Sequence, residues 1–203
     1  KKGVWHMSIV VSDLSFSYGS HEVLKNVSFR AEAGQLLSVL GPNGVGKSTL
    51  FQCMLKLLSG YRGRITVDGT DIRTLDAGAM AKKIAYIPQA HAPVFDFSVS
   101  DVVLMGTSAQ VSDVCIPGKT QVRLAERSME RVGISHLKQR GYLQISGGER
   151  QLVLIARALA QDAKVLVMDE PTSSLDYGNQ IRVLSQIKKL AGEGYTVVLS
   201  THN

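Results

Sequence analysis

Cysteine is scarce in this sequence of 203 residues. Only Cys53 and Cys115 are present, and neither lies in a CxxC pair or at metal-ligand spacing from a histidine. This scarcity excludes a disulfide framework and a zinc site built on cysteines. A reducing compartment suits such a chain, so we expect the protein on the cytosolic side of the cell.

Long hydrophobic runs and long basic runs are also absent. The apolar stretches at Val165–Met168 and Val197–Leu199 are far shorter than the roughly 20 residues that a membrane-spanning helix needs. No apolar segment follows the two lysines at the start of the chain, so it does not resemble a secretory signal. The net charge is +6, but the basic residues are scattered. We therefore expect neither a membrane span nor a nucleic-acid partner.

The remaining composition is that of a folded globular domain, with 44% hydrophobic and 20% charged residues. Alternating apolar and polar residues predict two half-buried strands near residues 14–18 and 27–31, joined by a turn at Gly19-Ser20. The stretch Leu36–Leu40 is apolar except for one serine, which predicts a strand buried on both faces. These strands indicate a small antiparallel sheet followed by the first strand of a second sheet.

A helix is predicted directly after this buried strand, with an apolar stripe that ends before Gly60. Further strands are predicted at 65–67, 84–87, 165–168 and 196–200, and the region from about 95 to 160 has helical periodicity. The residues that carry the apolar faces of the four predicted helices are Leu50, Cys53, Met54, Leu57 and Leu58, then Val122, Ala125, Met129 and Val132, then Leu152, Ile155, Ala156 and Leu159, and last Val183, Leu184, Ile187, Leu190 and Ala191.

A phosphate-binding loop is the strongest motif in the chain. Residues 41–48 match GxxxxGK[ST] between a predicted strand and a predicted helix, which is the context that this motif requires. Glycines let backbone N–H groups surround a phosphate at a helix N-terminus. Lys47 then supplies a charge for the β and γ phosphates, and the Ser48 hydroxyl can ligate Mg²⁺. The residues that this loop predicts for nucleotide binding are Gly41, Pro42, Asn43, Gly44, Val45, Gly46, Lys47, Ser48 and Thr49.

Two carboxylates, Asp169 and Glu170, follow the strand at Val165–Met168. The carboxyl ends of parallel strands form the edge at which ligands of open α/β sheets bind. Beside a phosphate-binding loop, Asp169 is predicted to hold Mg²⁺ and Glu170 to act as general base for an attacking water.

The segment Ile145-Ser146-Gly147-Gly148-Glu149-Arg150-Gln151 resembles the signature sequence of ABC-type ATPases. The rest of the chain is similar to this family in the same order of motifs. Gln89 resembles the Q-loop glutamine, residues 171–176 resemble the D-loop, and His202 resembles the switch histidine. The resemblance implies catalytic roles for Glu170, His202 and Gln89, and metal ligation by Ser48, Gln89 and Asp169. It implies adenine stacking by Tyr18 and contacts of Ser146, Gly147, Gly148, Glu149 and Asp176 with the ATP of a second chain in a homodimer.

The resemblance also implies the fold class and the domain organisation. We expect an α/β P-loop NTPase (RecA-like) core, a small N-terminal antiparallel β subdomain and an inserted α-helical signature subdomain. The whole of 1–203 is then one ABC ATPase domain, with its core at about 1–94 and 161–203 and its helical subdomain at about 95–160. Members of the family usually continue for several tens of residues past the switch histidine, so we expect the C-terminal part to be missing.

The function that the resemblance implies is ATP hydrolysis, with ATP and Mg²⁺ as cofactors, in a subunit that powers solute import through separate permease subunits. Such a subunit lies on the cytoplasmic face of the membrane and acts only indirectly with a substrate-binding protein. Glu149 and the general run of residues 27–104 favour importers of iron chelates, haem or cobalamin.

Two other classes of function compete with this one. A soluble ABC ATPase that takes part in iron-sulphur assembly stays open. DNA-repair members carry a long coiled coil between the Q-loop and the signature, whereas here Gln89 and Ser146 are 57 residues apart without a heptad run. Translation-type members carry two cassettes, and this sequence has one phosphate-binding loop. A non-catalytic scaffold is disfavoured because Lys47, Asp169, Glu170 and His202 occur together.

Overall fold

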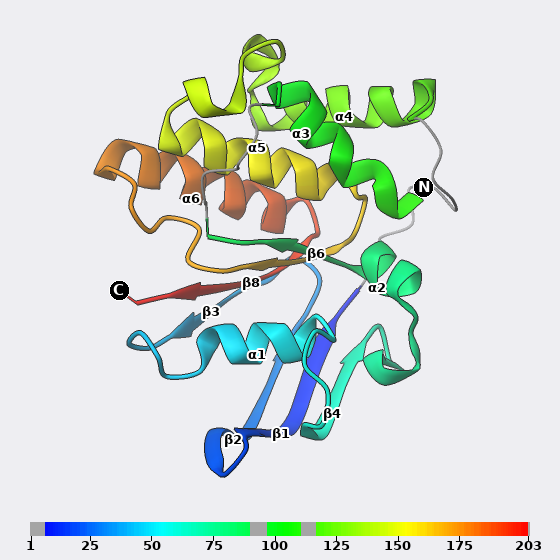
Figure 1. Cartoon of the computed structure of the whole chain (residues 1–203), viewed down its shortest axis with the longest axis vertical. Coiled ribbons are helices and arrows are strands. Elements are labelled where there is room, and N and C mark those ends of the chain that lie inside the picture. Colours follow the sequence, from blue (N-terminus) through cyan, green and yellow to red (C-terminus); the bar gives the residue numbers. More distant parts are fainter. Residues whose placement is uncertain (1–6, 90–96, 111–116, 203) are drawn as a thin grey trace.

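The computed structural model describes residues 7–89, 97–110 and 117–202. Cys115 and the first residues of the predicted helical region, 95 and 96, lie outside them. Figure 1 shows an antiparallel sheet at the bottom, helix α1 above it, a parallel sheet, and then two tiers of helices. The predicted α/β architecture with an antiparallel and a parallel sheet is confirmed.

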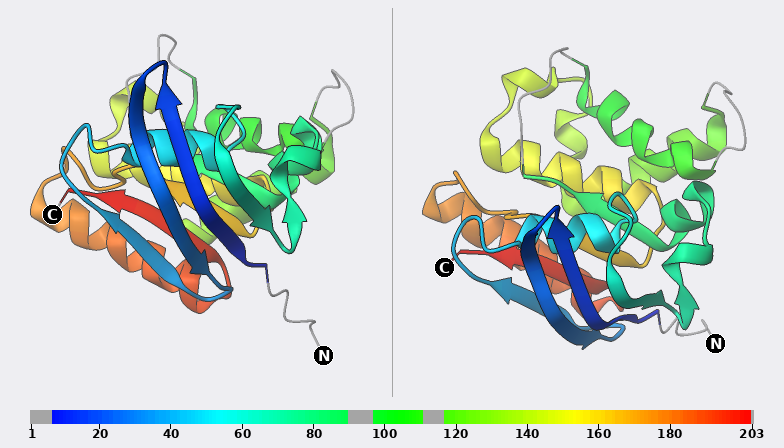
Figure 2. Two further views of the ribbon diagram at one scale, coloured as in Figure 1. Left: turned by 90° about the horizontal axis from the view of Figure 1, so that it is seen from below. Right: turned by 60° about the horizontal axis from the view of Figure 1, so that its bottom comes forward.

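The antiparallel sheet contains β1 (Ile9–Tyr18), β2 (His21–Ala31), β4 (Arg62–Val67) and β5 (Thr70–Asp71), in the order β2-β1-β4-β5. The two-residue turn at 19–20 joins β1 to β2 as predicted, with Gly19 at a φ of +59°. In both views of Figure 2 the strands β1 and β2 lie in front of α1 (Lys47–Met54). This sheet therefore covers one side of the helix that follows the phosphate-binding motif.

The parallel sheet contains β3 (Leu36–Leu40), β6 (Ile84–Ile87), β7 (Val165–Met168) and β8 (Thr196–Thr201), in the order β3-β8-β7-β6. Successive residues of β7 alternate between two hydrophobic clusters, so that Val165 and Val167 pack toward α1 and the antiparallel sheet, and Leu166 and Met168 pack toward the helices. A strand that is covered on both faces has a continuous run of apolar residues in its sequence, as β7 does.

Helices α5 (Gly147–Ala160) and α6 (Tyr177–Gly192) cover the other face of the parallel sheet, with α3 (Val99–Met105) and α4 (Lys119–Val132) above them (Figure 1). The predicted apolar face of α5 is confirmed, and the helix is buried on nearly every side because it lies between the sheet and α3 and α4. One short helix, α2 (Ala77–Lys83), lies before β6 and was not predicted, since its sequence lacks an apolar stripe. No helix within the described ranges is long and apolar enough to cross a bilayer.

The prediction that β3 is buried on both faces is wrong. Leu36 is 41% exposed and Leu40 is 66% exposed. The strand lies at an edge of the parallel sheet, and only its alternate residues Leu37 and Val39 pack against the cluster around α1. The apolar sequence therefore predicted the strand but not its place in the sheet.

The predicted length of the first helix is also wrong. Helix α1 ends at Met54, Lys56 takes a left-handed φ of +59°, and Leu57 is 68% exposed. The Lys56 ammonium donates to the carbonyl of Arg73 at 3.0 Å and also to that of Leu75. A tertiary contact therefore accompanies the end of this helix, and the apolar spacing does not reveal it.

Two residues on the predicted apolar faces of α4 and α6 are not buried. Val122 is 39% exposed and Leu184 is 45% exposed.

A substitution at Gly106 tests the packing of the helices. A Cβ at this position would lie 2.0 Å from the carbonyl oxygen of Arg157 in α5, so the backbone of one segment must move. We expect Gly106→Ala to lower the free energy of unfolding by about 2 kcal/mol or more, as overpacking does in close-packed interiors. The matched control is Gly192→Ala at the end of α6, where a Cβ meets nothing within 4 Å. Equal urea denaturation midpoints for the two variants would contradict this packing.

Candidate functional site

The phosphate-binding motif forms a loop between β3 and α1. Gly44 and Gly46 take left-handed φ values of +81° and +105°, which side chains with a Cβ rarely adopt. Gly46 is also the residue that precedes the first turn of α1, and a Cβ there would lie 2.9 Å from Cγ1 of Val23. Because the loop reverses direction at these glycines, its backbone leads directly into the N-terminus of α1, where unpaired N–H groups favour an anion.

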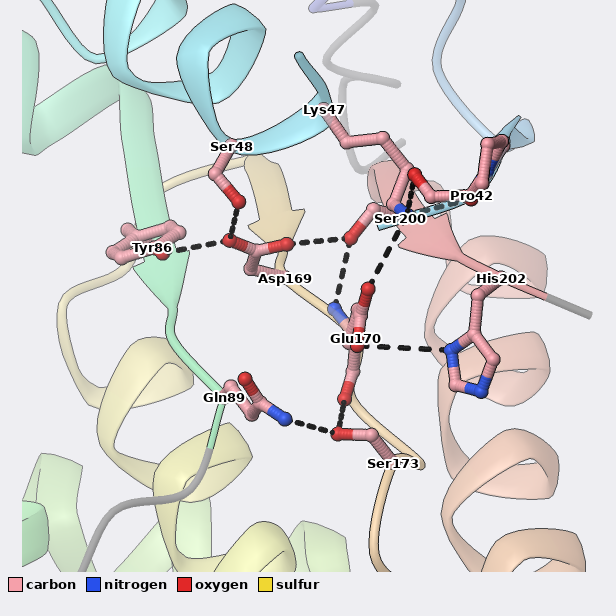
Figure 3. Close-up of polar contacts among 11 residues, drawn as sticks. Pro42, Lys47, Ser48, Tyr86, Gln89, Asp169, Glu170, Ser173, Ser200 and His202 are labelled. Atoms are coloured by element: carbon pink, nitrogen blue, oxygen red, sulfur yellow. Dashed lines mark hydrogen bonds and ion pairs between the residues drawn. The ribbon is translucent and has the colours of Figure 1, made fainter. Parts of the chain in front are cut away.

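Lys47, the first residue of α1, points its buried side chain back into this loop. Its ammonium donates to the carbonyls of Gly41 at 2.6 Å and Pro42 at 3.1 Å, and lies 3.3 Å from Oε1 of Glu170 (Figure 3). Only 6% of the Lys47 side chain and 15% of the Glu170 side chain are exposed. A charge removed from water is tolerated when it is paired and hydrogen-bonded, and both conditions are met here.

The carboxylate of Asp169 is held by hydroxyl groups from three different elements. Ser48 of α1 donates to Oδ2 at 2.9 Å, Ser200 of β8 donates to Oδ1 at 2.6 Å, and the Tyr86 hydroxyl of β6 lies 3.5 Å from Oδ2. Figure 3 shows Ser48 and Ser200 on different sides of this carboxylate. Burial, together with the neighbouring Asp169 carboxylate, raises the pKa of Tyr86 to about 12, so this hydroxyl stays a donor.

Glu170 lies just past the end of β7 with its backbone in the left-handed region, at a φ of +44°. Its N–H donates to the Ser200 hydroxyl at 2.9 Å, and its carbonyl accepts from the Ser173 hydroxyl at 2.9 Å. The side-chain amide of Gln89 donates to that same Ser173 hydroxyl at 2.8 Å. His202 places Nδ1 3.7 Å from Oε2 of Glu170. Gln89 and His202 are therefore both brought to Glu170, one through Ser173 and the other directly.

A pocket of about 440 Å³ lies between the glycine loop and the side chains of Gln89, Asp169 and Glu170. Residues that line it come from β1, β2, the glycine loop, α1, the end of β6 and the end of β7; they are Tyr18, Val23, Asn43, Gly44, Gly46, Lys47, Ser48, Thr49, Gln89, Asp169 and Glu170. The volume is in the range of small-molecule and cofactor sites. Tyr18 lies at the rim with 49% of its surface exposed and packs edge-on against Phe16. Most of the predicted ATP-binding residues are therefore brought together at one place.

The predicted signature residues do not line this pocket. Ser146 precedes α5, where its hydroxyl accepts from the N–H of Glu149 at 3.3 Å while its own N–H donates to the Glu149 carboxylate at 2.8 Å. This reciprocal pair is a capping box. A Cβ at Gly148 would lie 2.3 Å from Oδ1 of Asn179, and the carboxylate of Asp176 accepts two hydrogen bonds from that asparagine. The signature and the start of α6 thus form a second cluster, built around two helix N-termini.

The local role of Glu149 could have been found in the sequence, because S-x-x-E before a helix predicts a capping box. Ser200 and Tyr86, by contrast, were missed, and nothing in their sequence neighbourhood marks them. They become important only because β6, β7 and β8 are adjacent strands of one sheet. Ser173 lies in the segment that resembles the D-loop, but its hydrogen bond with Gln89 was not predicted.

A pH series tests the capping box. Hydrogen bonds from the backbone and hydroxyl of Ser146 lower the pKa of Glu149, so its stabilising effect is present above the ordinary carboxyl pKa and is lost as the pH falls through the lowered value. We expect Glu149→Gln to reduce the free energy of unfolding by about 0.5–1 kcal/mol at pH 7, as loss of a charge at a helix N-terminus does. The difference from the parent should shrink as the pH falls below the ordinary carboxyl pKa. Urea unfolding that gives the same difference at pH 7 and at the lowest pH at which the parent stays folded would contradict this role.

The sequence matches the family described as ABC transporter over residues 24–173. Among curated proteins, an uncharacterized ABC transporter ATP-binding protein of Haemophilus influenzae is 44% identical over 197 residues, which cover 97% of this chain and 75% of the relative. The manganese transport system ATP-binding protein MntB of Halalkalibacterium halodurans is 38% identical, with 96% and 76% covered.

A solved structure of an ABC transporter is also similar to this chain. An inward-facing transporter classed as being of the metal-chelate type superposes with a TM-score of 0.86 at 35% identity, covering 97% of this chain and 73% of the other. The match of the family extends over the glycine loop, the capped signature helix and the two carboxylates, which are the features that the geometry singles out. The chain therefore belongs to the ABC transporter family, as an ATP-binding domain that hydrolyses ATP.

Proposed function

We propose that this chain powers the import of a metal-bearing solute, by hydrolysing ATP in the pocket between the glycine loop and the end of β7. One observation carries the catalytic part of the proposal: Lys47 and Ser48 contact Glu170 and Asp169, although 121 residues separate Ser48 from Asp169. A loop that binds phosphates and a pair of carboxylates that can serve a metal and a water are thus parts of one site.

Lys47 and the glycine loop bind the phosphates in this proposal. The Lys47 ammonium already lies against two loop carbonyls and the Glu170 carboxylate. A phosphate oxygen that enters the loop competes with Glu170 for this ammonium, because both are anionic acceptors of the same charge-assisted hydrogen bonds. Binding of the triphosphate then leaves the Glu170 carboxylate free to accept a proton. Tyr18 at the rim stacks on the adenine ring.

Ser48 and Asp169 are proposed to hold Mg²⁺, with Gln89 as a further ligand. A hydroxyl oxygen and a carboxylate oxygen 2.9 Å apart, next to the loop, are the hard oxygen donors that this ion prefers. The residues present therefore fit the ion. When bound, Mg²⁺ neutralises negative charge on the β and γ phosphates.

Glu170 is proposed as the general base that accepts a proton from the attacking water. His202, whose side chain is 46% exposed beside it, is proposed to contact the γ phosphate. The hydrogen bonds from Gln89 to Ser173 and from Ser173 to the Glu170 carbonyl link the end of β6 to the base. A shift of the Gln89 side chain is thereby transmitted through Ser173 to the backbone of Glu170.

A head-to-tail homodimer completes the site in this proposal. The signature residues Ser146, Gly147 and Gly148 form the N-terminus of a 14-residue helix, which favours an anion, yet they do not line the pocket of their own chain. In a symmetric dimer, each helix end and Asp176 face the ATP bound by the other chain. We propose further that residues 1–94 and 161–203 act as the core and 95–160 as a helical subdomain that moves with dimer closure.

The solute proposal rests on the relatives. One relative is named as the ATP-binding protein of a manganese transport system, and one structural neighbour is classed as a metal-chelate transporter. We therefore propose an iron chelate, haem, cobalamin or a metal ion as the solute, carried by separate permease subunits that this chain serves from the cytoplasmic face of the membrane. A substrate-binding protein delivers the solute and does not contact this chain.

Lys47→Ala tests the phosphate-binding role. Loss of one charge-assisted contact, worth about 1.5–3 kcal/mol, should weaken ATP binding by roughly 10- to 100-fold. Calorimetric titration of ATP measures this change, and Lys188→Ala on the exposed face of α6 serves as the control. Equal ATP affinity in both variants would exclude Lys47 from the binding site.

Glu170→Gln tests the role of the base. The variant should bind ATP as tightly as the parent but hydrolyse it at least about 100-fold more slowly, since loss of a general base typically costs 10²–10⁴ in rate. Light scattering should then show a dimer that persists in ATP. Glu130→Gln, on the exposed surface of α4, is the control. Hydrolysis by Glu170→Gln at the parental rate would show that another group activates the water.

Copurification from the native cell tests the transport role separately. A permease with six or more membrane-spanning helices, retained with this chain in detergent, supports import. Retention of cysteine-rich assembly proteins in place of a permease would favour the soluble iron-sulphur alternative.

A further inference from the structure

Ser200 lies on β8, between β3, which leads into the glycine loop, and β7, which the two carboxylates follow. It is fully buried, and its single hydroxyl makes two hydrogen bonds, one as donor and one as acceptor. Figure 3 shows this hydroxyl between the Asp169 carboxylate and the backbone nitrogen of Glu170. None of the sequence motifs includes it.

The first bond fixes the orientation of the Asp169 carboxylate. Ser200 donates to Oδ1 at 2.6 Å, whereas Ser48 and Tyr86 both contact Oδ2. A carboxylate can rotate about its last side-chain bond, and this torsion has a broad energy minimum. Because Ser200 binds one oxygen from the sheet side, the other oxygen stays directed at Ser48 and the glycine loop.

The second bond holds the backbone of Glu170. The Ser200 oxygen accepts the Glu170 N–H at 2.9 Å, and Glu170 has the left-handed φ of +44° that a residue with a side chain seldom adopts. Such a conformation persists only where surrounding contacts impose it. One hydroxyl thus constrains two neighbouring residues, Asp169 through its carboxylate and Glu170 through its backbone N–H.

We propose that Ser200 is a positioning residue, which aims Oδ2 of Asp169 at the Mg²⁺ position and keeps Glu170 at the attacking water. This inference rests on the proposed ATPase mechanism. It assigns to β8 a role in metal-dependent nucleotide binding, in addition to carrying the switch histidine at its end.

The test compares Ser200→Ala with Thr196→Val in the full chain. Thr196 lies on the same strand, is also fully buried, and uses its hydroxyl to bind the carbonyl of Met7, far from the pocket. Both variants therefore remove one buried hydroxyl from β8. Calorimetric titration of a non-hydrolysable ATP analogue, with and without Mg²⁺, measures how strongly the metal tightens nucleotide binding. Steady-state kinetics give kcat and the KM for ATP.

We expect Ser200→Ala to bind the analogue without Mg²⁺ within about 2-fold of the parent, and to lose about 10-fold of the tightening that Mg²⁺ produces. Its kcat should fall by about 10-fold or more, and its KM for ATP in the presence of Mg²⁺ should rise because the metal tightens binding less. Thr196→Val should keep the parental Mg²⁺ effect and the parental kcat, whatever its unfolding temperature.

If Ser200→Ala matches Thr196→Val in the Mg²⁺ effect and in kcat, the positioning role is wrong, while the ATPase mechanism stands. A parent chain that binds the analogue with Mg²⁺ but hydrolyses no ATP would contradict the proposed function instead. In that case the binding measurements still test the role of Ser200: a weaker Mg²⁺ effect in Ser200→Ala than in Thr196→Val supports it, and equal effects contradict it.

Discussion

The place of β8 between β3 and β7 is the constraint on which the site depends. Parallel pairing puts the carboxyl ends of all three strands at one edge, so the glycine loop, the two carboxylates and His202 meet there. The sheet is held by side chains that alternate between two hydrophobic clusters, one with α1 and one with α5 and α6. Packing on both faces therefore fixes the positions of groups that are remote in sequence.

The buried charges of the site follow from this arrangement. Lys47 is almost wholly buried, and its charge is stabilised by two carbonyls and by Glu170. Removing a single member of such a group leaves another charge unpaired, which costs more than the pair itself contributes. A triphosphate offers Lys47 an alternative partner of the same sign as Glu170. In the proposed mechanism, binding of ATP and release of the Glu170 carboxylate are therefore coupled through one ammonium group.

Much of this fold could be predicted because its elements have strong local patterns. The strands at 84–87 and 165–168 are confirmed at both ends. The glycine loop can be identified as an anion site from its sequence motif alone. The exposure of Leu40, the early end of α1 and the role of Ser200 could not be predicted in the same way. They depend on strand order and on contacts such as that of Lys56 with Arg73, which no local pattern encodes.

A crystal structure of the chain with ATP and Mg²⁺, grown from a variant that cannot hydrolyse the nucleotide, tests the central claim most directly. The account predicts a triphosphate in the loop of residues 41–48, with Ser146 of a second copy in contact with its γ phosphate. A structure in which the nucleotide lies elsewhere, or in which Ser146 faces solvent in a dimer with bound nucleotide, would contradict it.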